Sequence, residues 1–183
     1  MSRPDGHPQS HRVTAPHAAD PRDQISLTHV REDGSAHMVD VSDKDVTARS
    51  ARAQAVLHTR PDVTAQLAEG ALPKGDALAT ARIAGIMAAK RTSELVPLCH
   101  PLPITKVTVD FEVDQPEPGS VAIAAEVRTT SRTGVEIEAL TAVSVAAVTL
   151  YDMIKAVDRA AVITDQQVIH KAGGRQGEWT RHD

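Results

Sequence analysis

Aromatic side chains are very scarce in this sequence, and the shortage restricts the kind of core that the chain can build. Phe111, Tyr151 and Trp179 are the whole supply in 183 residues. A core must therefore be filled with Ala, Val, Leu and Ile, whose small side chains favour close packing of helices and strands. The shortage also argues against a platform for single-stranded nucleic acid, because such platforms stack bases on aromatic faces.

Length and charge narrow the class of protein further. A chain of 183 residues, 41% of them hydrophobic, is long enough for one domain with its own core. Twenty lysines and arginines against 24 aspartates and glutamates give a formal charge of −4, so we expect neither nucleic acid nor a membrane as partner. The single cysteine excludes an intrachain disulfide and a cysteine-rich zinc site. Without a long apolar run or a signal-peptide pattern, we expect a cytoplasmic protein.

The N-terminal part of the chain changes character near residue 27. Residues 1–26 are rich in Pro, His, Arg and Asp and poor in apolar side chains, which is typical of a disordered tail. The stretch 36–44 alternates enough to predict a short strand. Residues 45–58 predict a helix with an arginine-bearing polar face.

Two further helices are predicted over residues 61–70 and 75–95. Pro61 is typical of a first helical position, and Gly70 is typical of a helix end. Asp76 is placed to cap the second helix. The alanines and glycine of that helix indicate that another element packs closely against it.

The C-terminal half combines an antiparallel hairpin with a buried helix. Residues 104–114 and 121–131 alternate as two strands around a turn that contains proline and glycine. A strand-like alternation over 134–139 runs into 140–160, where three apolar turns predict a buried helix.

Residues 161–172 predict a final strand, and a glycine-rich loop and tail follow it. Helices interleaved with antiparallel hairpins, without a regular strand–helix alternation, predict the α+β class. We therefore expect one catalytic domain over 27–178, between the tail 1–26 and a C-terminal tail over 179–183.

Two lysines stand where the chain can approach an anion closely. Lys74 precedes the predicted 75–95 helix, and the free N–H groups at a helix start favour anions. Lys171 and Arg175 flank a pair of glycines and could close a mobile basic loop over a phosphate. A solvated lysine beside a helix cap and a flexible basic terminus are the plainer alternatives, and the local sequence leaves them open.

Leu98, Cys99 and His100 lie between Pro97 and Pro101, which restrict the backbone of this segment. A rigidly placed imidazole suits proton transfer or a hydrogen bond to a substrate. Adjacent residues of an extended segment point to opposite sides, so we do not expect Cys99 to pair with His100. A thiol that fills the core, next to a histidine with local partners, explains the same residues equally well.

Three carboxylates and a lysine are candidates for proton transfer. Glu136 and Glu138 would share one face of a strand about 7 Å apart, close enough to raise the pKa of one of them. An amphipathic edge strand would show the same alternation. Asp152 and Lys155 lie one turn apart on the predicted buried helix and can touch. Burying either charge alone is costly, which favours a structural ion pair or a site that opens onto this helix.

Motifs for metals and cofactors do not occur in the sequence. No group of His, Cys and carboxylate residues has metal-ligand spacing, and dinucleotide, phosphate-loop and nucleophile-elbow patterns do not occur. The residues together predict a small enzyme that uses no metal and no cofactor. It would combine anion binding with proton transfer on a nucleotide-like small molecule.

Four segments of the chain resemble one family, the cyclic pyranopterin monophosphate synthases (molybdenum cofactor biosynthesis protein C). They are AHMVDVSDK at 36–44, KGDALATARIAGIMAAKRTSELVPLCHPLPIT at 74–105, GVEIEALTAVSVAAVTLYDMIKA at 134–156 and the glycine loop at 171–177. The segments occur in the family's order, and the likeness covers about 27–178.

The resemblance implies a ferredoxin-like fold, with an antiparallel sheet and helices on one face. It also implies a homohexamer, a trimer of dimers, with sites at subunit interfaces. The implied reaction is that of a lyase without redox cofactor. It converts (8S)-3′,8-cyclo-7,8-dihydroguanosine 5′-triphosphate to cyclic pyranopterin monophosphate, with release of pyrophosphate.

The resemblance also implies roles for individual residues. Asp152 matches the catalytic aspartate, and Lys74 and Lys155 match lysines associated with catalysis. The positions expected to bind substrate are Leu98, Cys99, His100, Glu136, Ile137, Glu138 and Lys171. On this basis Lys74, Lys155 and Lys171 are expected to hold the triphosphate. Asp152, with His100 and the glutamates, is expected to move protons during ring opening and closure.

Departures from the family pattern are few. Ile137 stands where methionine is usual, and Ile154 where cysteine is frequent. Arg175 and Gln176 replace the common lysine and serine, so no role is predicted for them. Two alternatives retain the fold without the reaction, a nucleotide-phosphate binding module and a scaffold protein of cofactor assembly. Pyrophosphate release by the purified protein would distinguish the enzyme from both.

Overall fold

A computed structural model describes residues 30, 31, 33–72 and 74–182 of the chain. The chain divides into two compact units, Met1–Ala36 and His37–Asp183. In the first unit, a bridge between Val30 and Ala36 closes a short turn. The predicted tail 1–26 lies outside the described residues. The predicted domain over 27–178 and its tails remain predictions.

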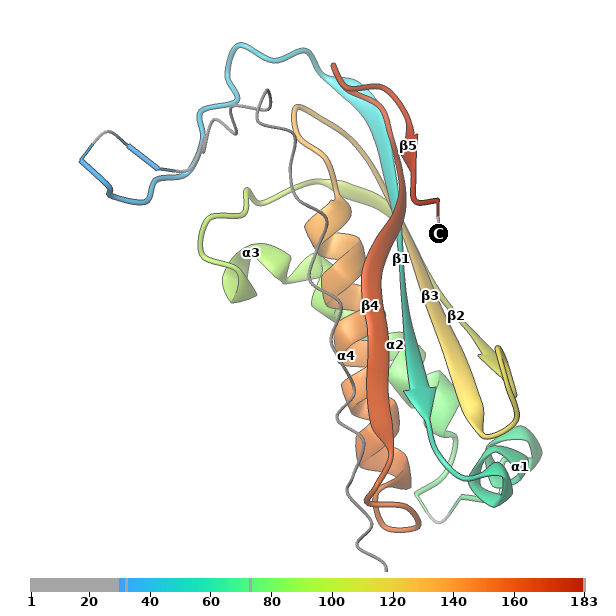
Figure 1. Ribbon diagram of the computed structural model, residues 1–183. Coiled ribbons are helices and arrows are strands. Elements are labelled where there is room, and N and C mark those ends of the chain that lie inside the picture. The colour runs from blue at the N-terminus through green and yellow to red at the C-terminus, as the bar shows by residue number, and fades with distance from the viewer. Residues whose placement is uncertain (1–29, 32, 73, 183) are drawn as a thin grey trace, which may run out of the picture. The chain divides into compact units, whose positions relative to one another are not determined.

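Five antiparallel strands form the single sheet of the second unit, in the order β2-β3-β1-β4-β5 (Figure 1). The two longest strands, β1 and β3, pair along their whole length at the centre of the sheet. The strands are β1 (Thr47–His58), β2 (Ile104–Val113), β3 (Ser120–Ser131), β4 (Val162–Ala172) and β5 (Trp179–Thr180).

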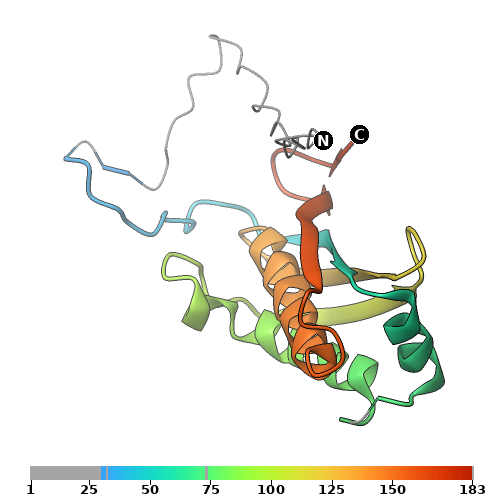
Figure 2. The same cartoon turned by 60° about the horizontal axis from the view of Figure 1, so that its bottom comes forward.

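Two long helices cover one face of this sheet and pack against each other (Figure 2). The four helices of the described residues are α1 (Pro61–Glu69), α2 (Ala77–Lys90), α3 (Thr92–Leu95) and α4 (Glu136–Ile154). The covering pair is α2 and α4. The predicted α+β class, with an antiparallel sheet and helices packed against it, is confirmed.

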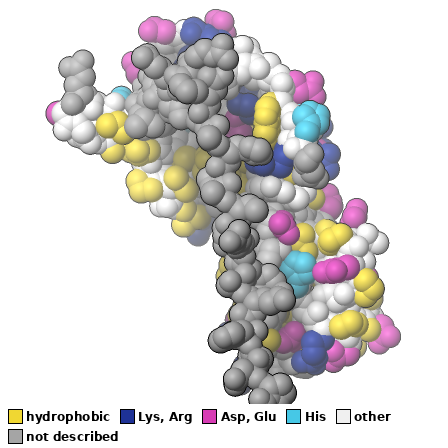
Figure 3. All heavy atoms as spheres, viewed as in Figure 1, with side chains coloured by type: hydrophobic (Ala, Val, Ile, Leu, Met, Phe, Trp, Pro, Cys, Tyr) yellow, Lys and Arg dark blue, Asp and Glu magenta, His cyan; other side chains and the backbone are white. Residues whose placement is uncertain are grey.

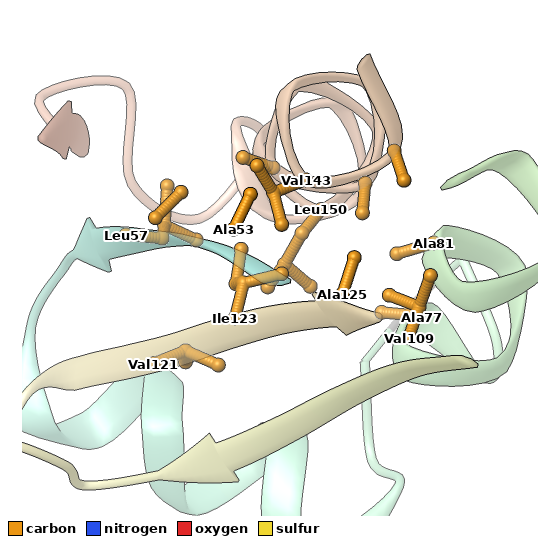
Figure 4. Packing of buried hydrophobic residues seen from close by; sticks show 14 of the residues in the cluster. Ala53, Leu57, Ala77, Ala81, Val109, Val121, Ile123, Ala125, Val143 and Leu150 are labelled. Atoms are coloured by element: carbon orange, nitrogen blue, oxygen red, sulfur yellow. The ribbon is translucent and has the colours of Figure 1, made fainter. Parts of the chain in front are cut away.

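Small side chains fill the interface between the sheet and the helices, as the shortage of aromatic residues predicts. Ala53 of β1 and Ala125 of β3 point toward Val143 and Leu150 of α4 (Figure 4). Where the helices cross, a Cβ atom added to Gly85 would lie 2.8 Å from the carbonyl oxygen of Ala142. Glycine and alanine at this crossing therefore allow the two helix backbones to approach closely.

Several predicted element boundaries are confirmed. Pro61 opens α1, and Gly70 ends it in the left-handed conformation with a φ of 66°. Asp76 caps α2, because its side chain accepts a hydrogen bond from the Ala79 backbone N–H at 2.9 Å. The hairpin β2–β3 and the strand β4 also lie where the sequence predicts them.

The predicted helix over 45–58 is wrong, because this stretch is the central strand β1. Its alanines, arginines and glutamine favour helices, but every second residue from Ala51 to Leu57 is buried under the helices. Hydrogen bonds to β3 and β4 on both sides outweigh that local preference. The predicted strand over 36–44 is also wrong, because only Ala36 makes a bridge there.

The predicted strand-like segment 134–139 is wrong as well, because α4 already begins at Glu136. A few alternating residues are too short to distinguish a strand period from the first turn of a helix. The predicted helix 75–95 is interrupted at Arg91, where α2 ends and α3 begins. Two residues of the predicted C-terminal tail pair with β4 as strand β5.

The helix α4 is the one described helix long and apolar enough to cross a membrane, with a mean hydropathy of 1.5. Half of that stretch is buried inside the protein. The contacts of α4 with α2 and with four strands of the sheet explain its apolar composition. This is the pattern of a core helix.

Candidate active site

The predicted site residues gather at the two ends of α4, and not in one place. Asp152, Lys155 and Lys74 lie at its C-terminal end, and Glu136 and the remaining residues lie around its N-terminal end. Glu136 and Asp152 are about 24 Å apart along the axis, since a helix rises 1.5 Å per residue. Figure 1 shows α4 lying along the sheet.

At the C-terminal end, Asp152 lies between two lysines. The Lys155 Nζ atom is 2.6 Å from one carboxylate oxygen of Asp152, and the Lys74 Nζ atom is 2.9 Å from the other. Lys74 also donates a hydrogen bond to the Asp152 carbonyl oxygen at 2.7 Å. The loop before α2 thus brings Lys74 to the last turn of α4, although 78 residues separate it from Asp152.

The two lysines hold Asp152 in its charged form. Hydrogen bonds from Lys155 and Lys74 lower the pKa of the Asp152 carboxyl, and the same contact raises the pKa of Lys155. Both Asp152 and Lys155 have about half of their side-chain surface exposed, 53% and 50%. The expectation of a pair buried on an apolar helix is therefore wrong, because Asp152 projects from the exposed side of the last turn and Lys155 follows the helix end.

At the N-terminal end, Glu138 points into the protein. Only 4% of its surface is exposed, and burial raises its pKa from 4.5 to about 7. Burial raises the pKa of the Cys99 thiol, and the nearby charge of Glu138 raises it further. The segment Leu98–His100 therefore lies beside the first turn of α4, with each of its three residues partly buried.

Glu136 and Glu138 do not share a face, contrary to the expectation from a strand. Residues two apart on a helix point in different directions. Glu138 is buried, whereas Glu136 turns toward β4 and lies 3.4 Å from the Lys171 Nζ atom. Between them, Ile137 is 39% exposed.

Lys171 connects α4 with the glycine loop after β4. It donates a hydrogen bond to the Gln176 side-chain oxygen at 2.9 Å, in addition to its ion pair with Glu136. Gln176, for which the sequence predicts no role, is therefore a direct partner of a predicted site residue.

A hollow of about 580 Å³ opens at this end of α4 and contains residues that the sequence analysis missed. Its cationic lining residues are Lys44, Arg49, Arg132, Lys171 and Arg175. Arg49 belongs to the stretch that local sequence predicts as a helix, whereas it lies on strand β1 and lines the hollow. Lys44 and Arg132 lie 88 residues apart in sequence, and no local pattern connects them.

The described residues offer few groups for a metal ion. Within residues 30–31, 33–72 and 74–182, no three His, Cys, Asp or Glu side chains gather in a suitable arrangement. The reaction's independence of metals and cofactors stays a prediction from the sequence.

The sequence pattern of the MoaC family matches residues 38–174, which include both ends of α4. The chain belongs to the MoaC family. Cyclic pyranopterin monophosphate synthase 2 of Mycobacterium bovis is 62% identical to it over 155 residues, which are 85% of this chain and 91% of that protein. The resemblance that the sequence motifs indicate is confirmed.

Two further relatives agree with this MoaC assignment. Cyclic pyranopterin monophosphate synthase of a Nocardioides species is 62% identical over 156 residues, 85% of this chain and 95% of that protein. The synthase of Streptomyces coelicolor is 60% identical over 162 residues, 88% of this chain and 92% of that protein. The matched MoaC region contains every predicted site residue, whereas Arg175, Gln176 and Trp179 follow its end.

Proposed function

We infer that this chain catalyses the reaction for which its relatives are named. It is a cyclic pyranopterin monophosphate synthase of molybdenum cofactor biosynthesis. The observation that carries this conclusion is about 60% identity to such synthases over most of both chains, within one family pattern. The substrate is (8S)-3′,8-cyclo-7,8-dihydroguanosine 5′-triphosphate, which is rearranged to cyclic pyranopterin monophosphate while pyrophosphate leaves.

Glu138 and Asp152 have different roles in the proposed chemistry. The rearrangement opens one ring and closes another, so protons must be removed and returned near neutral pH. Glu138, with a pKa of about 7, suits both directions of that transfer, with His100 as a neighbouring hydrogen-bonding group. Asp152 stays a carboxylate, fixes Lys74 and Lys155, and acts with them as the catalytic group of the site.

Substrate contacts come from the N-terminal end of α4. The substrate is bound on one side of the first helical turn by Leu98, Cys99 and His100. It is bound from the turn itself by Glu136, Ile137 and Glu138, and from β4 by Lys171. Lys171 is held by Glu136 and Gln176, which presents its ammonium group to a phosphate in a defined position.

The active enzyme is a homohexamer, a trimer of dimers, with sites between subunits. The separation of about 24 Å between the two ends of α4 supports this assembly, because one substrate cannot contact both ends in one chain. The outer side of the helices and the adjoining α3 leave large apolar side chains exposed: Ile83, Met87, Leu95, Ile137 and Val148. Figure 3 shows hydrophobic side chains gathered over α3.

The strand order supports a ferredoxin-like description of the subunit. Without the short β5, the order β2-β3-β1-β4 with helices on one face is that of a β-α-β-β-α-β unit. We place the enzyme in the cytoplasm, with no nucleic acid and no membrane as partner.

Pyrophosphate release from the cyclic dihydroguanosine triphosphate tests the proposed function. Purified protein without added metal or reductant should form cyclic pyranopterin monophosphate and pyrophosphate in equal amounts. Binding of the substrate without turnover would instead indicate a nucleotide-phosphate binding module. Neither binding nor turnover would indicate a scaffold protein.

A further inference from the structure

The chain continues past the matched MoaC region, which ends at residue 174, and there it turns back on Lys171. The Gly177 N–H donates to the Gly174 carbonyl oxygen at 3.2 Å and closes a turn over 174–177. Strand β5 follows this turn and pairs with the end of β4, where Trp179 lies opposite Lys171. Residues 162–180 therefore form a C-terminal hairpin, with Lys171 in its stem.

Contacts at both ends keep the C-terminal hairpin in place. Behind β5, Arg181 donates from its backbone N–H to the Ile169 carbonyl oxygen at 2.9 Å and from Nε to the Val168 carbonyl oxygen at 3.0 Å. At the other end, a Cβ atom on Gly173 would overlap the Ala48 carbonyl oxygen of β1. Gly173, with a φ of 94°, thus allows the loop to lie directly against β1.

Gln176 lies at the third position of the turn, and its side chain returns to the stem. Its Oε1 atom accepts a hydrogen bond from the Lys171 Nζ atom at 2.9 Å. Glu136 approaches the same ammonium group from α4, with 3.4 Å between Nζ and the carboxylate oxygen. A distance of 3.4 Å is longer than an ordinary N–H···O hydrogen bond, so Gln176 makes the tighter contact. An ammonium group has three donors, so a donor remains for the substrate.

The position of the Lys171 ammonium group matters because it lies between two hollows. Glu136, Lys171 and Gln176 line both the hollow of about 580 Å³ and a second one of about 540 Å³, which Trp179 also lines. A lysine side chain is long and flexible, so an ammonium group without a fixed partner would be distributed between the two hollows. The hydrogen bond to Gln176 restricts it to the boundary that they share.

We propose that Gln176 is a positioning residue of this enzyme, which holds the Lys171 ammonium group where it meets the substrate. This inference rests on the proposed function, in which Lys171 binds substrate. Gln176 acts through Lys171 and not on the reacting atoms. It should therefore set the affinity for the substrate and leave the chemical step unchanged. The hairpin beyond the matched MoaC region thus contributes to the site.

Steady-state kinetics of Gln176→Met test this role, with the cyclic dihydroguanosine triphosphate as substrate. Methionine keeps the length of the side chain and removes the acceptor oxygen. KM should rise about 3- to 10-fold, while kcat stays within about twofold of the wild-type value. Gln166→Met is the matched control. The Gln166 Oε1 atom also accepts a hydrogen bond, from the Ser144 Oγ atom at 2.9 Å, but Gln166 lines neither hollow. Its replacement should leave KM within about twofold of the wild-type value.

Chemical labelling reads the position of Lys171 without the substrate. Acetic anhydride should label Lys171 about threefold faster in Gln176→Met than in the wild type, because the hydrogen bond no longer competes with the reaction. Mass spectrometry of peptides measures this rate, with the exposed Lys106 as internal reference. Quenching of Trp179, the only tryptophan, by acrylamide should not change, because the hairpin itself stays closed.

An unchanged KM in Gln176→Met, or equal increases in Gln176→Met and Gln166→Met, would overturn the proposal. A lower kcat at unchanged KM would do the same. Stronger quenching of Trp179 would show that the hairpin opens, which is a structural role and not a positioning one. Faster labelling of Lys171 in a protein without turnover would retain its contact with Gln176 and refute the proposed function. Turnover by the wild type, with unchanged labelling of Lys171 in Gln176→Met, would refute the positioning role alone.

Discussion

Glu138 and Asp152 are both carboxylates on α4, but their surroundings shift their pKa values in opposite directions. Burial raises the pKa of Glu138 to about 7, whereas hydrogen bonds from two lysines lower that of Asp152. At neutral pH the first group can gain or lose a proton, and the second remains charged. The residue type is therefore less informative than the contacts that each side chain makes.

Glu138→Gln should make the folded enzyme less sensitive to pH. In the wild-type chain, the folded state retains a proton that the unfolded state releases, so the free energy of unfolding falls as the pH rises from 4.5 to about 7. The variant lacks this loss and should be the more stable protein above pH 7, by up to about 3 kcal/mol. Urea unfolding at about pH 5 and pH 8 measures the difference.

The matched control for this pH dependence is Glu136→Gln. Glu136 keeps 30% of its side chain exposed and is paired with Lys171. If the free energy of unfolding changed with pH in the same way for Glu138→Gln and the wild type, the prediction would be contradicted. The activity of Glu138→Gln should fall as well, since an amide cannot transfer the proton.

Asp152→Asn should abolish turnover with little effect on stability. A solvent-exposed ion pair with a lysine contributes little to stability, so the variant should unfold close to the wild-type temperature. Its rate of pyrophosphate release should fall about 100-fold or more. Asp62→Asn, which also removes an exposed carboxylate from an ion pair, should keep the wild-type rate. A folded Asp152→Asn protein with full turnover would remove Asp152 from the site.

At the scale of elements, the crossing of α2 and α4 depends on small residues. Gly85 packs against Ala142 and Ala146, and Thr92 holds the end of α2 through hydrogen bonds to two carbonyls of its last turn. The same two helices position the site, because α2 follows Lys74 and α4 carries Asp152 and Glu138. The spacing of the helices therefore also sets where these proposed site residues lie.

Gly85→Ala should destabilise the protein, although alanine is the better helix former by about 1 kcal/mol. The added Cβ would meet the Ala142 carbonyl oxygen at 2.8 Å and the Ala146 side chain at 3.1 Å, and both belong to a packed helix. We expect a net loss of about 1–3 kcal/mol, measured by urea unfolding. A higher unfolding temperature than the wild type would show that α4 can move away at low cost.

At the scale of the whole molecule, one chain contains both groups of proposed site residues but separates them along α4. The Asp152 group and the arginine hollow lie at opposite ends of that helix, while apolar side chains remain exposed on its outer side. When two copies associate, each copy can contribute a different end of α4 to one site. The same association can bury the exposed apolar side chains. An enzyme built this way is active only as an oligomer.

Mixed oligomers test this arrangement directly. Asp152→Asn and Glu138→Gln subunits are each expected to be inactive, but they carry their defects at opposite ends of α4. After subunit exchange, a site formed by two chains should recover about a quarter of the wild-type turnover, because some sites then receive only intact groups. Mixing Asp152→Asn with Lys155→Gln, which affect the same end, is the control and should recover nothing. Equal behaviour of the two mixtures would place the whole site in one chain.

Local sequence alone determined the features whose causes lie within a few residues. Pro61, Gly70 and Asp76 mark helix ends, the β2–β3 hairpin follows its alternation and turn, and the scarcity of aromatic residues predicts a core of small side chains. The long motifs around Lys74, His100 and Asp152 were specific enough to indicate the family.

Only the tertiary structure decided what depends on distant partners. The stretch 45–58 has helix-favouring residues, yet pairing on both edges makes it β1, and this change places Arg49 in the hollow. Glu138 is buried whereas Glu136 is not. A hydrogen bond between residues 78 positions apart in sequence brings Lys74 to Asp152. Local pattern records the preferences of neighbouring residues, whereas burial and charge pairing arise from segments that meet only when the chain folds.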